Sequence, residues 1–551
     1  MPTAAQLLVR CLLEQDVEYG FGVPGESYLA VLDALHDAGN AFTFINARHE
    51  GGAAFMAEGY AKLTGKPGVV FVTRGPGATN ASIGVHTAMQ DSVPMVVFVG
   101  QIETTMRERE AFQELDYRAV FGPMCKWATE VEHPDRMAEI VARAFTVAQS
   151  GRPGPVVVAL PEDVLVGQTD ARSRGRIVPV QATPGADDAR RVMQRIAQAE
   201  RPVVLAGGGG WTRAGARDLQ RWAEANALPV IVAFRNQDLM DGRSPSYVGD
   251  ASFGMDPAIR SFMDGSDLIV ALNVRFGETL TDAYRLFDPA TFETPLIHVH
   301  ASEGELGKIF TPDLAILSDP DRMVAELATT APQGGDAPWA QRTRDAHAAW
   351  ENQLEAAGHG SALDLHAVMR RLREVLPDDA IVTNGAGNFA IWAGKLLVYG
   401  GERRLIGPQA GSMGAGVPAA VAAKLVDRSR TVVCFAGDGD FQMTGMELAT
   451  AAQYDARPIV LLFNNGAYGT IRMHQERDYP DRVSGTRLDN PDFVTLAAAF
   501  GMHAERVEET GQFSDAWERA VASPTGALIE LMQDPDVLSP SATISGLRAR
   551  A

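Results

Sequence analysis

Cysteine, long apolar runs and positive charge are all scarce in this sequence of 551 residues. Its three cysteines, Cys11, Cys125 and Cys434, lie far apart without CxxC spacing, so we expect buried, reduced thiols and a cytoplasmic protein. No run approaches the roughly 18 apolar residues of a membrane span. The formal net charge of -20 argues against nucleic acid as a partner, because such binding needs a basic face. These scarcities favour a protein that acts on small molecules, away from membranes.

The length of the chain exceeds what one hydrophobic core supports and favours three domains. Short apolar runs alternate with helical patterns in residues 1–165, 185–331 and 360–535, which predicts three α/β domains with doubly wound parallel sheets. Polar stretches at 165–184 and 331–341 are typical of linkers. Residues 1–16 favour an amphipathic helix over a signal peptide. Residues 536–551 form a tail that is either mobile or folded over the site.

The expected strands are short apolar runs between turn signals. In the order of the chain they are 19–23, 43–46, 68–72, 95–100, 156–160, 202–206, 229–233, 267–272, 295–299, 380–383, 405–406, 431–436, 458–463 and 527–531. A helical pattern follows at 444–454.

The most informative stretch joins two of these strands. Strand 431–436 meets Gly437-Asp438-Gly439, and strand 458–463 leads into Asn464 and Asn465. Because neighbouring parallel strands end side by side, Asp438 should face the asparagines across a crevice. Carboxylate and amide oxygens suit Mg²⁺, and flanking glycines with a helix N-terminus suit phosphate. Gly-Asp-Gly alone is better explained as a strand-to-helix turn, but its pairing with Asn-Asn predicts a metal-bridged diphosphate site.

Gly-Asp-Gly, 24 intervening residues and Asn-Asn resemble the thiamine diphosphate (ThDP) motif, and the chain is identified as a member of the ThDP enzyme superfamily. Four further blocks resemble, in order, the pyrimidine-binding domain of acetolactate synthase: GVPGES, RHEGGAAFMAEGYAK, RGPGATN and AFQELD. The resemblance implies pyrimidine-binding, central and diphosphate-binding domains of the ThDP-enzyme type. It also implies ThDP and Mg²⁺ as cofactors and a homodimer with shared active sites, further assembled as a dimer of dimers.

In the first domain the resemblance makes Glu50 the catalytic glutamate, whose carboxyl hydrogen-bonds the pyrimidine ring. Position alone would not single it out, since acidic residues are favoured in a first helical turn. The resemblance makes Pro76 and Asn80 walls of the aminopyrimidine pocket, although RGPGATN is also an ordinary Pro/Gly turn. Three residues are implied near the reacting carbon: Gly25, Phe112 and Gln113.

In the third domain the resemblance makes Met413 the large residue under ThDP that forces its rings into a V, where a core methionine is the alternative. Gly411 is then a backbone partner of the 4'-amine. The resemblance implies Asp438, Asn465 and the carbonyl of Ala467 as Mg²⁺ ligands. A second phosphate loop is expected at Asn384, Gly385 and Asn388, where the family more usually has Gly-Gln-His. The remaining implied cofactor contacts are Gly437, Gly439, Asp440, Tyr468, Gly469 and Thr470.

The sequence departs from acetolactate synthases at three places. His300 and Ser302 stand where FAD-carrying synthases have an acidic pair, which puts FAD in doubt. The glycine run 207–210 is a nucleotide loop or a tight turn. Thr279 and His474 replace the arginine and tryptophan of the acceptor pocket, and a hydroxyl lacks the charged fork of a guanidinium.

The implied reaction is decarboxylation of a 2-oxo acid, followed by protonation or by transfer to an acceptor such as an aldehyde. An acetolactate synthase-like carboligase, with His474 at its acceptor side, is the leading hypothesis. Another ThDP-dependent decarboxylase or acyloin lyase is the alternative, because function depends on the site rather than on the fold. A non-catalytic binding protein with the same fold is a third possibility, which Glu50, Asp438 and Asn465 argue against.

Overall fold

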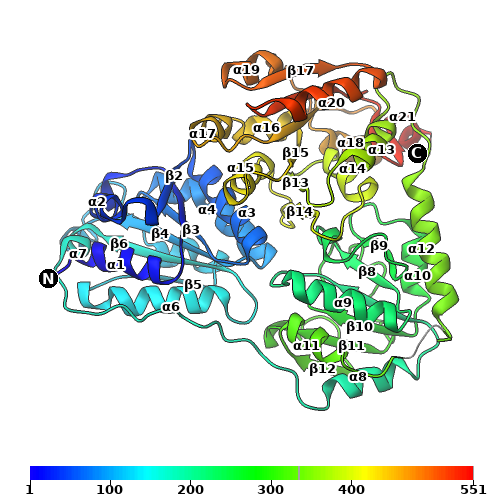
Figure 1. Ribbon diagram of the computed structural model, residues 1–551, viewed down its shortest axis with the longest axis horizontal. Coiled ribbons are helices and arrows are strands. Elements are labelled where there is room, and N and C mark those ends of the chain that lie inside the picture. Colours follow the sequence, from blue (N-terminus) through cyan, green and yellow to red (C-terminus); the bar gives the residue numbers. More distant parts are fainter. Residues whose placement is uncertain (333–335, 550–551) are drawn as a thin grey trace.

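The computed structural model describes residues 1–332 and 336–549. Three six-stranded sheets follow one another along the chain (Figure 1). In Figure 1 the first lies at the left in blue and cyan, the second at the lower right in green, and the third at the upper right in yellow to red. Neighbouring strands within all three sheets are parallel, with helices on both faces. The predicted α/β fold class is therefore confirmed.

The first sheet has the order β2-β1-β3-β4-β6-β5. Helices α1, α2 and α6 pack on one of its faces, and α3 and α4 pack on the other. The strands are β1 Tyr19–Gly22, β2 Thr43–Asn46, β3 Gly68–Val72, β4 Met95–Gln101, β5 Trp127–Glu130 and β6 Pro155–Pro161. The helices are α1 Ala4–Glu14, α2 Leu29–Ala38, α3 Glu50–Thr64, α4 Pro76–Asp91, α5 Tyr117–Phe121, α6 Met137–Gln149 and α7 Glu162–Val166.

The second sheet has the order β12-β11-β10-β7-β8-β9. Its strands are β7 Pro202–Ala206, β8 Val230–Ala233, β9 Tyr247–Ala251, β10 Leu268–Leu272, β11 Leu296–His300 and β12 Leu314–Leu317. Its helices are α8 Asp188–Ile196, α9 Arg213–Ala225, α10 Pro257–Asp264, α11 Pro320–Leu327 and α12 Ala340–Leu354.

The third sheet has the order β14-β13-β15-β16-β18-β17, so β15 and β16 lie side by side at its centre. Its strands are β13 Ile381–Asn384, β14 Arg404–Ile406, β15 Val432–Gly437, β16 Ile459–Asn464, β17 His503–Val507 and β18 Ala527–Met532. Its helices are α13 Leu365–Val375, α14 Phe389–Leu396, α15 Gly416–Val426, α16 Asp438–Thr444, α17 Glu447–Gln453, α18 Gly469–Asp478, α19 Phe493–Ala499 and α20 Phe513–Ala522.

The helix predicted at 444–454 is present as α17, which begins three residues later, and a second helix, α16, precedes it. The chain forms two helices there, α16 from Asp438 and α17 from Glu447, separated by a turn at Gly445 and Met446. Gly445 packs against the ring of Phe441, where an added Cβ would lie 2.7 Å from a ring carbon. Because α16 begins directly after the last residue of β15, its first turn carries Asp438 and Asp440 at the strand end.

Of the three six-stranded sheets, the sequence-based prediction lacks four strands, β5, β9, β12 and β17, and all four lie at sheet edges. Three of them lack a continuous buried run: β12 alternates between buried and exposed residues, and β5 and β17 are mostly half-buried. An edge strand packs less fully than a central one, so its sequence need not be uniformly apolar.

The two predicted linkers and the C-terminal tail differ in how much regular secondary structure they contain. Residues 170–184 contain neither helix nor strand, as expected of a linker. Within the second predicted linker, residues 333–335 lie outside the described residues. The C-terminal tail folds rather than hanging free: β19 Val537–Ser539 pairs with β20 Ala542–Thr543, and α21 Ile544–Arg548 packs on α18. The Nε and Nη2 atoms of Arg548 each donate a 2.9 Å hydrogen bond to the carboxylate of Glu476 on α18.

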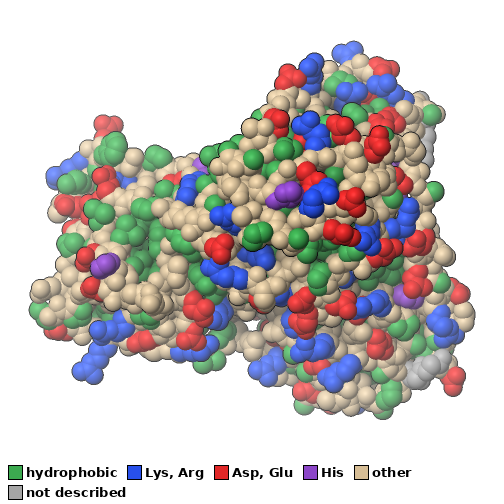
Figure 2. Space-filling view, turned by 45° about the horizontal axis from the view of Figure 1, so that its top comes forward, with side chains coloured by type: hydrophobic (Ala, Val, Ile, Leu, Met, Phe, Trp, Pro, Cys, Tyr) green, Lys and Arg blue, Asp and Glu red, His purple; other side chains and the backbone are tan. Residues whose placement is uncertain are grey.

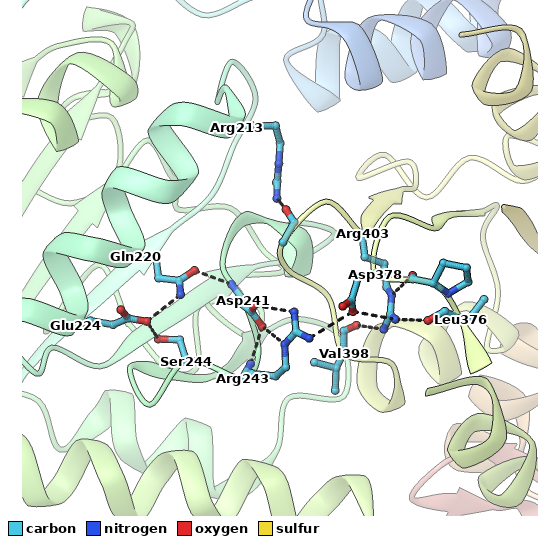
Figure 3. Close-up of polar contacts among 12 residues, drawn as sticks. Arg213, Gln220, Glu224, Asp241, Arg243, Ser244, Leu376, Asp378, Val398 and Arg403 are labelled. Atoms are coloured by element: carbon cyan, nitrogen blue, oxygen red, sulfur yellow. Dashed lines mark hydrogen bonds and ion pairs between the residues drawn. The ribbon is translucent and has the colours of Figure 1, made fainter. Parts of the chain in front are cut away.

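Polar contacts join the central and third domains (Figure 3). Arg213 donates through Nη2 to the carbonyl of Gly401, and Arg243 donates through Nη1 to Asp378 over 3.3 Å. The first and third domains meet through α3 and α15, where Gly59 lies directly against Ala419. Within the described residues, no helix is both long and apolar enough to cross a membrane.

Candidate active site

A cavity of about 230 Å³ opens at the ends of β15 and β16 in the third domain. It is where the two central strands deliver Gly437-Asp438-Gly439 and Asn464-Asn465, as the topology requires. The predicted residues that line it are Asn388, Gly411, Met413, Gly437, Asp438, Gly439, Asp440, Asn465, Ala467, Tyr468, Gly469 and Thr470. Ala386 and Gly387, within the predicted phosphate loop 384–388, line it as well, and so do four residues that were not predicted: Phe389, Phe463, Ile471 and Gln533.

Asp438 is the acidic residue at the mouth of β15. Its Oδ1 accepts a 2.9 Å hydrogen bond from the Gly439 N–H, and its Oδ2 accepts a 2.8 Å bond from Nδ2 of Asn490. Burial raises the pKa of Asp438 because it penalises the charged form, and the Asn490 bond opposes that rise. A cation beside this carboxylate would offset the cost of burial directly.

The two asparagines point in different directions. Asn464 donates to Glu530 over 2.7 Å and accepts from Asn490 over 2.9 Å, away from the cavity. Asn465 lines the cavity, and its Oδ1 accepts a 3.1 Å bond from the Ala467 N–H. The first asparagine therefore fixes the end of the strand, and the second is available to a ligand.

Asn490 is a site residue that sequence reasoning missed. It bridges Asp438 and Asn464, and Gln442 on α16 donates to its Oδ1 over 3.0 Å. The residue lies in an irregular loop 26 residues after Asn464, without periodicity or a neighbouring motif. No signal in one sequence distinguishes it from other loop asparagines.

The donor set fits Mg²⁺ bound together with a diphosphate. Asp438, Asn465 and Ala467 bring a carboxylate, an amide oxygen and a backbone carbonyl to one cavity. No cluster of three or more His, Cys, Asp or Glu that could hold a metal occurs in the described residues. A hard cation here would therefore complete its octahedron with phosphate oxygens and water, which is how Mg²⁺ is usually bound.

Packing also requires glycine at the two positions beside Asp438. A Cβ at Gly437 would lie 2.6 Å from the ring of Phe389, and one at Gly439 would lie 2.6 Å from the ring of Tyr468. These aromatic rings close against the backbone at both sides of Asp438. Larger residues at either position would displace a wall of the cavity.

Asp440 braces two loops of the cavity. Its Oδ1 accepts from the Ala386 N–H over 3.0 Å and from the Gly414 N–H over 2.8 Å. Burial raises the pKa of Asp440 to about 7, and these two backbone bonds oppose the rise. Gly385 lies so close that an added Cβ would sit 2.0 Å from that oxygen. Asn384 and Gly385, predicted as cofactor contacts, lie behind the loop and do not line the cavity.

Met413 and Gly411 belong to the second of these loops, just before α15. Gly411 adopts a positive φ of 67°, and Met413 is half-buried in the cavity wall rather than packed in a core. On the opposite side, Thr470 at the start of α18 donates to Oδ1 of Asn388 over 2.9 Å. The cavity is thus bounded by three loops that are bonded to one another.

The first domain gathers a second group of predicted residues. Glu50 is the first residue of α3 and Pro76 the first of α4, and the two helix starts face each other. Nδ2 of Asn80 donates to Oε2 of Glu50 over 2.9 Å, and Gly77 packs against the same carboxyl. The Glu50 carboxyl is therefore buried and bonded to a specific side chain. An acidic residue that only stabilised the start of a helix would need neither property.

Phe112 and Gln113 lie on a loop that is held against residues 73–77. Nε of Arg74 donates to the Phe112 carbonyl over 3.0 Å. Gln113, whose own φ is 65°, packs on Gly75. Gly25 approaches the same loop, because a Cβ there would lie 2.4 Å from Cβ of Thr73. The structure thus brings all six predicted residues of the first domain to one face, and none of them lines the cavity of the third domain.

Comparison with known proteins connects both groups of residues. Three family models match the chain in order: the N-terminal TPP binding domain of thiamine pyrophosphate enzymes at residues 2–120, their central domain at 189–327, and their C-terminal TPP binding domain at 385–531. Acetolactate synthase isozyme 2 large subunit of Escherichia coli (strain K12) is 31% identical over 96% of this chain and 95% of that protein.

The chain belongs to the thiamine pyrophosphate (ThDP) enzyme family. Acetolactate synthase isozyme 3 large subunit of the same bacterium is 32% identical over 91% of the chain and 89% of its own length. The probable acetolactate synthase large subunit of Methanocaldococcus jannaschii is 30% identical over 96% of the chain and 92% of its own length. The similarity to acetolactate synthase large subunits is distant and extends over the full length.

Two predicted acceptor residues of this ThDP enzyme lie outside the cavity. His474 is exposed on α18, and Thr279 is half-buried in an irregular segment after β10 of the central domain. His300, at a position where the FAD-carrying synthases have an acidic residue, is buried beside His298, and burial lowers its pKa to about 4. Both histidines are therefore neutral near pH 7.

The glycine run of the central domain makes close backbone contacts. A Cβ at Gly208 would lie 2.3 Å from the Asn273 carbonyl oxygen, and one at Gly209 would lie 2.2 Å from that of Ser92. These contacts explain the glycines as a tight turn packed on the first domain. They do not exclude a ligand, since the run also lines a cavity between the domains.

Proposed function

We propose that this ThDP enzyme binds ThDP and Mg²⁺ and decarboxylates a 2-oxo acid, with carbon–carbon bond formation or aldehyde release as the outcome. The observation that carries the proposal is the convergence of Asp438, Asn465, Ala467 and Met413 on one cavity at the ends of β15 and β16. Full-length similarity to proteins named acetolactate synthases supports the reaction class.

In this proposal Asp438, Asn465 and the Ala467 carbonyl hold Mg²⁺, and the N–H groups at the start of α16 face the diphosphate. Met413, in the cavity wall, would pack against the bound cofactor and hold it in place. When bound, ThDP supplies the nucleophilic carbon and the electron sink that decarboxylation needs. Glu50 exchanges a proton with the pyrimidine ring through its carboxyl, and the Asn80 bond fixes the direction of that carboxyl.

The working enzyme is a homodimer with shared sites, further associated as a dimer of dimers. Within one chain the Glu50 group and the Asp438 cavity belong to different domains, and no residue of the Glu50 group lines that cavity. Large apolar side chains stay exposed beside both: Phe112 at 72%, Met446 at 59% and Met443 at 49%. In Figure 2 hydrophobic side chains gather at the left, over the first domain. A second copy in two-fold arrangement would cover such surfaces and bring a Glu50 to each Asp438.

Among related reactions, we favour transfer to an uncharged acceptor, or simple aldehyde release, over formation of acetolactate. Thr279 and His474 supply no guanidinium where the synthases use one to hold the acceptor carboxylate. A hydrogen bond between charged groups contributes about 1.5 to 3 kcal/mol, or one to two powers of ten in affinity, which a hydroxyl does not recover. His474 can hydrogen-bond a polar acceptor.

The test supplies pyruvate with equal concentrations of competing aldehydes and 2-oxo acids and identifies the products by mass spectrometry. We expect acyloins or free aldehyde to exceed acetolactate. If acetolactate dominates at a turnover of about 1 to 1000 per second, another group holds the acceptor carboxylate and the inference from Thr279 is wrong. If no substrate turns over although ThDP binds, a non-catalytic binding protein is the better description.

Two further properties belong to the proposal. The enzyme works without FAD, because a buried neutral His300 and an uncharged Ser302 stand where the FAD-carrying synthases have the acidic pair. It works in the reducing cytoplasm, which the three buried, unpaired thiols support.

A further inference from the structure

Arg235 of the central domain reaches into the third domain and bonds a loop of the cofactor cavity. It follows β8, and its Nη2 donates a 2.9 Å hydrogen bond to the carbonyl oxygen of Gly385. Gly385 immediately precedes Ala386, Gly387 and Asn388, which line the cavity. The contact is fully buried, so water does not compete for the carbonyl.

The bond acts on a peptide group that is held at both ends. The carbonyl of Gly385 and the N–H of Ala386 belong to the same peptide, and that N–H donates to Oδ1 of Asp440 over 3.0 Å. A cation at the oxygen end and a carboxylate at the N–H end match the peptide dipole, so each contact strengthens the other. The same Asp440 oxygen accepts from Gly414, which extends the brace to the loop of Met413.

The backbone of Arg235 is in an unfavourable conformation. Its φ is 62°, in the left-handed region that bulky residues rarely occupy. Glycine would adopt this conformation without cost, so the local turn does not call for arginine. A strained residue persists where the surrounding structure holds it in place, and such outliers cluster at functional sites.

The charge of Arg235 is also poorly compensated within the chain. Burial lowers its pKa to about 10, so the guanidinium stays charged near pH 7. It forms no ion pair within 4 Å in the described part of the chain, and its Nη1 has no hydrogen-bond partner there. Asp91 and Asp440 stabilise the charge only from farther away. Buried cations are normally paired, so this one lacks its counter-charge.

The cavity, in turn, lacks positive charge in its lining. No lysine or arginine lines it, whereas Asp438 and Asp440 do. A diphosphate placed there would meet two carboxylates, and Mg²⁺ would offset only part of the negative charge. A buried guanidinium one peptide away from the lining is the positive group best placed to balance the remainder.

We propose that Arg235 is a positioning residue of the cofactor site, which orients the Gly385–Ala386 peptide and supplies the buried positive charge that the cavity lining lacks. This inference rests on the proposed function, since it presumes a diphosphate in the cavity. Its consequence is that the central domain contributes to cofactor affinity without touching the cofactor.

The test measures binding of ThDP with Mg²⁺, of inorganic pyrophosphate with Mg²⁺, and of unphosphorylated thiamine to the cofactor-free full-length protein by calorimetry. In Arg235→Gly we expect ThDP and pyrophosphate to bind about ten- to a hundredfold more weakly, by the range for hydrogen bonds to charged groups, with thiamine unchanged. Arg235→Lys should lie in between. Because glycine fits a φ of 62°, the Tm of cofactor-free Arg235→Gly should stay within a few degrees of the wild type.

Arg213→Gln is the matched control. Arg213 likewise donates from the central domain to a carbonyl of the third, that of Gly401, and no hydrogen bond joins it to a described residue of the cavity loops (Figure 3). Its ThDP affinity should equal that of the wild type. Equal ThDP affinity in Arg235→Gly overturns the inference, as does a parallel loss of affinity in Arg213→Gln. If Arg235→Gly fails to fold, wild-type affinity in Arg235→Lys overturns it.

The same binding measurements distinguish a failure of the proposed function from a failure of the role of Arg235. In that case the wild-type protein itself binds neither ThDP nor pyrophosphate, and Arg235 loses its assigned role together with Asp438. Wild-type binding that Asp438→Ala removes, but that Arg235→Gly leaves intact, refutes only the role of Arg235.

Discussion

The two halves of the proposed site are built differently. The Asp438 half is a cavity closed by bonds within one chain, where Asp440 braces two loops and Asn490 bridges two strand ends. The Glu50 half is a surface on which Phe112 is 72% exposed, and none of its predicted residues lines the cavity of the first half. One half is therefore preorganised by the chain itself, and in the proposed dimer a second copy completes the other.

The hydrogen-bond partners explain why one chain closes the Asp438 half but leaves the Glu50 half open. In the third domain Asp440 and Asn490 bond groups of that domain's own loops, and Arg235 adds one bond from the central domain, so folding of a single chain shapes the cavity. In the first domain the Glu50–Asn80 bond fixes a carboxyl direction but supplies no opposite wall. Metal and diphosphate binding should therefore depend on groups within one chain, whereas in the proposed dimer proton transfer depends on two copies.

The largest effect should follow loss of the only carboxylate among the proposed Mg²⁺ ligands. Asp438→Ala should abolish Mg²⁺-dependent ThDP binding while the protein still folds, because removing a buried acid also removes its desolvation cost. Titration of ThDP by tryptophan fluorescence measures this. Asp489→Ala, at an exposed carboxylate of a nearby loop, is the control and should bind normally. Unchanged affinity in Asp438→Ala would refute the cation site.

Glu50→Gln should separate binding from proton transfer. The amide keeps the shape of the side chain but cannot exchange the proton, so exchange of the thiazolium C2 hydrogen in deuterated solvent should slow by about 10² to 10⁴. ThDP should still bind, because the Asp438 half is intact. Rates come from NMR after acid quenching, with the exposed Glu18→Gln as control. Equal rates in Glu50→Gln and wild type would remove Glu50 from its role.

Mixing the two inactive variants tests the shared site. A heterodimer of Glu50→Gln and Asp438→Ala chains regains one site with both residues intact and has one site with neither. Random reassortment should then restore about a quarter of wild-type activity, since half the dimers are mixed and half their sites work. Co-expression with two affinity tags isolates the mixed dimer. No recovery in that purified mixed dimer would show that each chain builds its own site.

The sequence predicted most central strands and the meeting of Asp438 with Asn465, because both depend on continuous apolar runs and on the geometry of neighbouring parallel strands. It missed the edge strands β5, β12 and β17, whose residues are only partly buried. It also missed Asn490, which reaches the site from an irregular loop. Positions such as Asn490 follow from tertiary packing, and no local pattern in the chain marks them.

The smallest predicted effect concerns the tail, which extends the preorganised half. Arg548 bonds Glu476 on α18, and this bond, ahead of those from the Asp481 N–H and Arg472, lowers the pKa of Glu476 from its usual 4.5 to about 2. A depressed acid pKa stabilises the fold fully above about pH 4.5 and loses its effect as pH falls toward 2. Arg548→Ala should therefore lower the Tm by about one to three degrees near pH 7, and the gap should close on acidification. Differential scanning calorimetry from pH 3 to 7 measures both.

Arg487→Ala, which removes an exposed pair with Asp489, should show no gap at any pH. A gap for Arg548→Ala that does not change with pH would mean that the tail is held by packing of α21 on α18 rather than by the charge of Glu476.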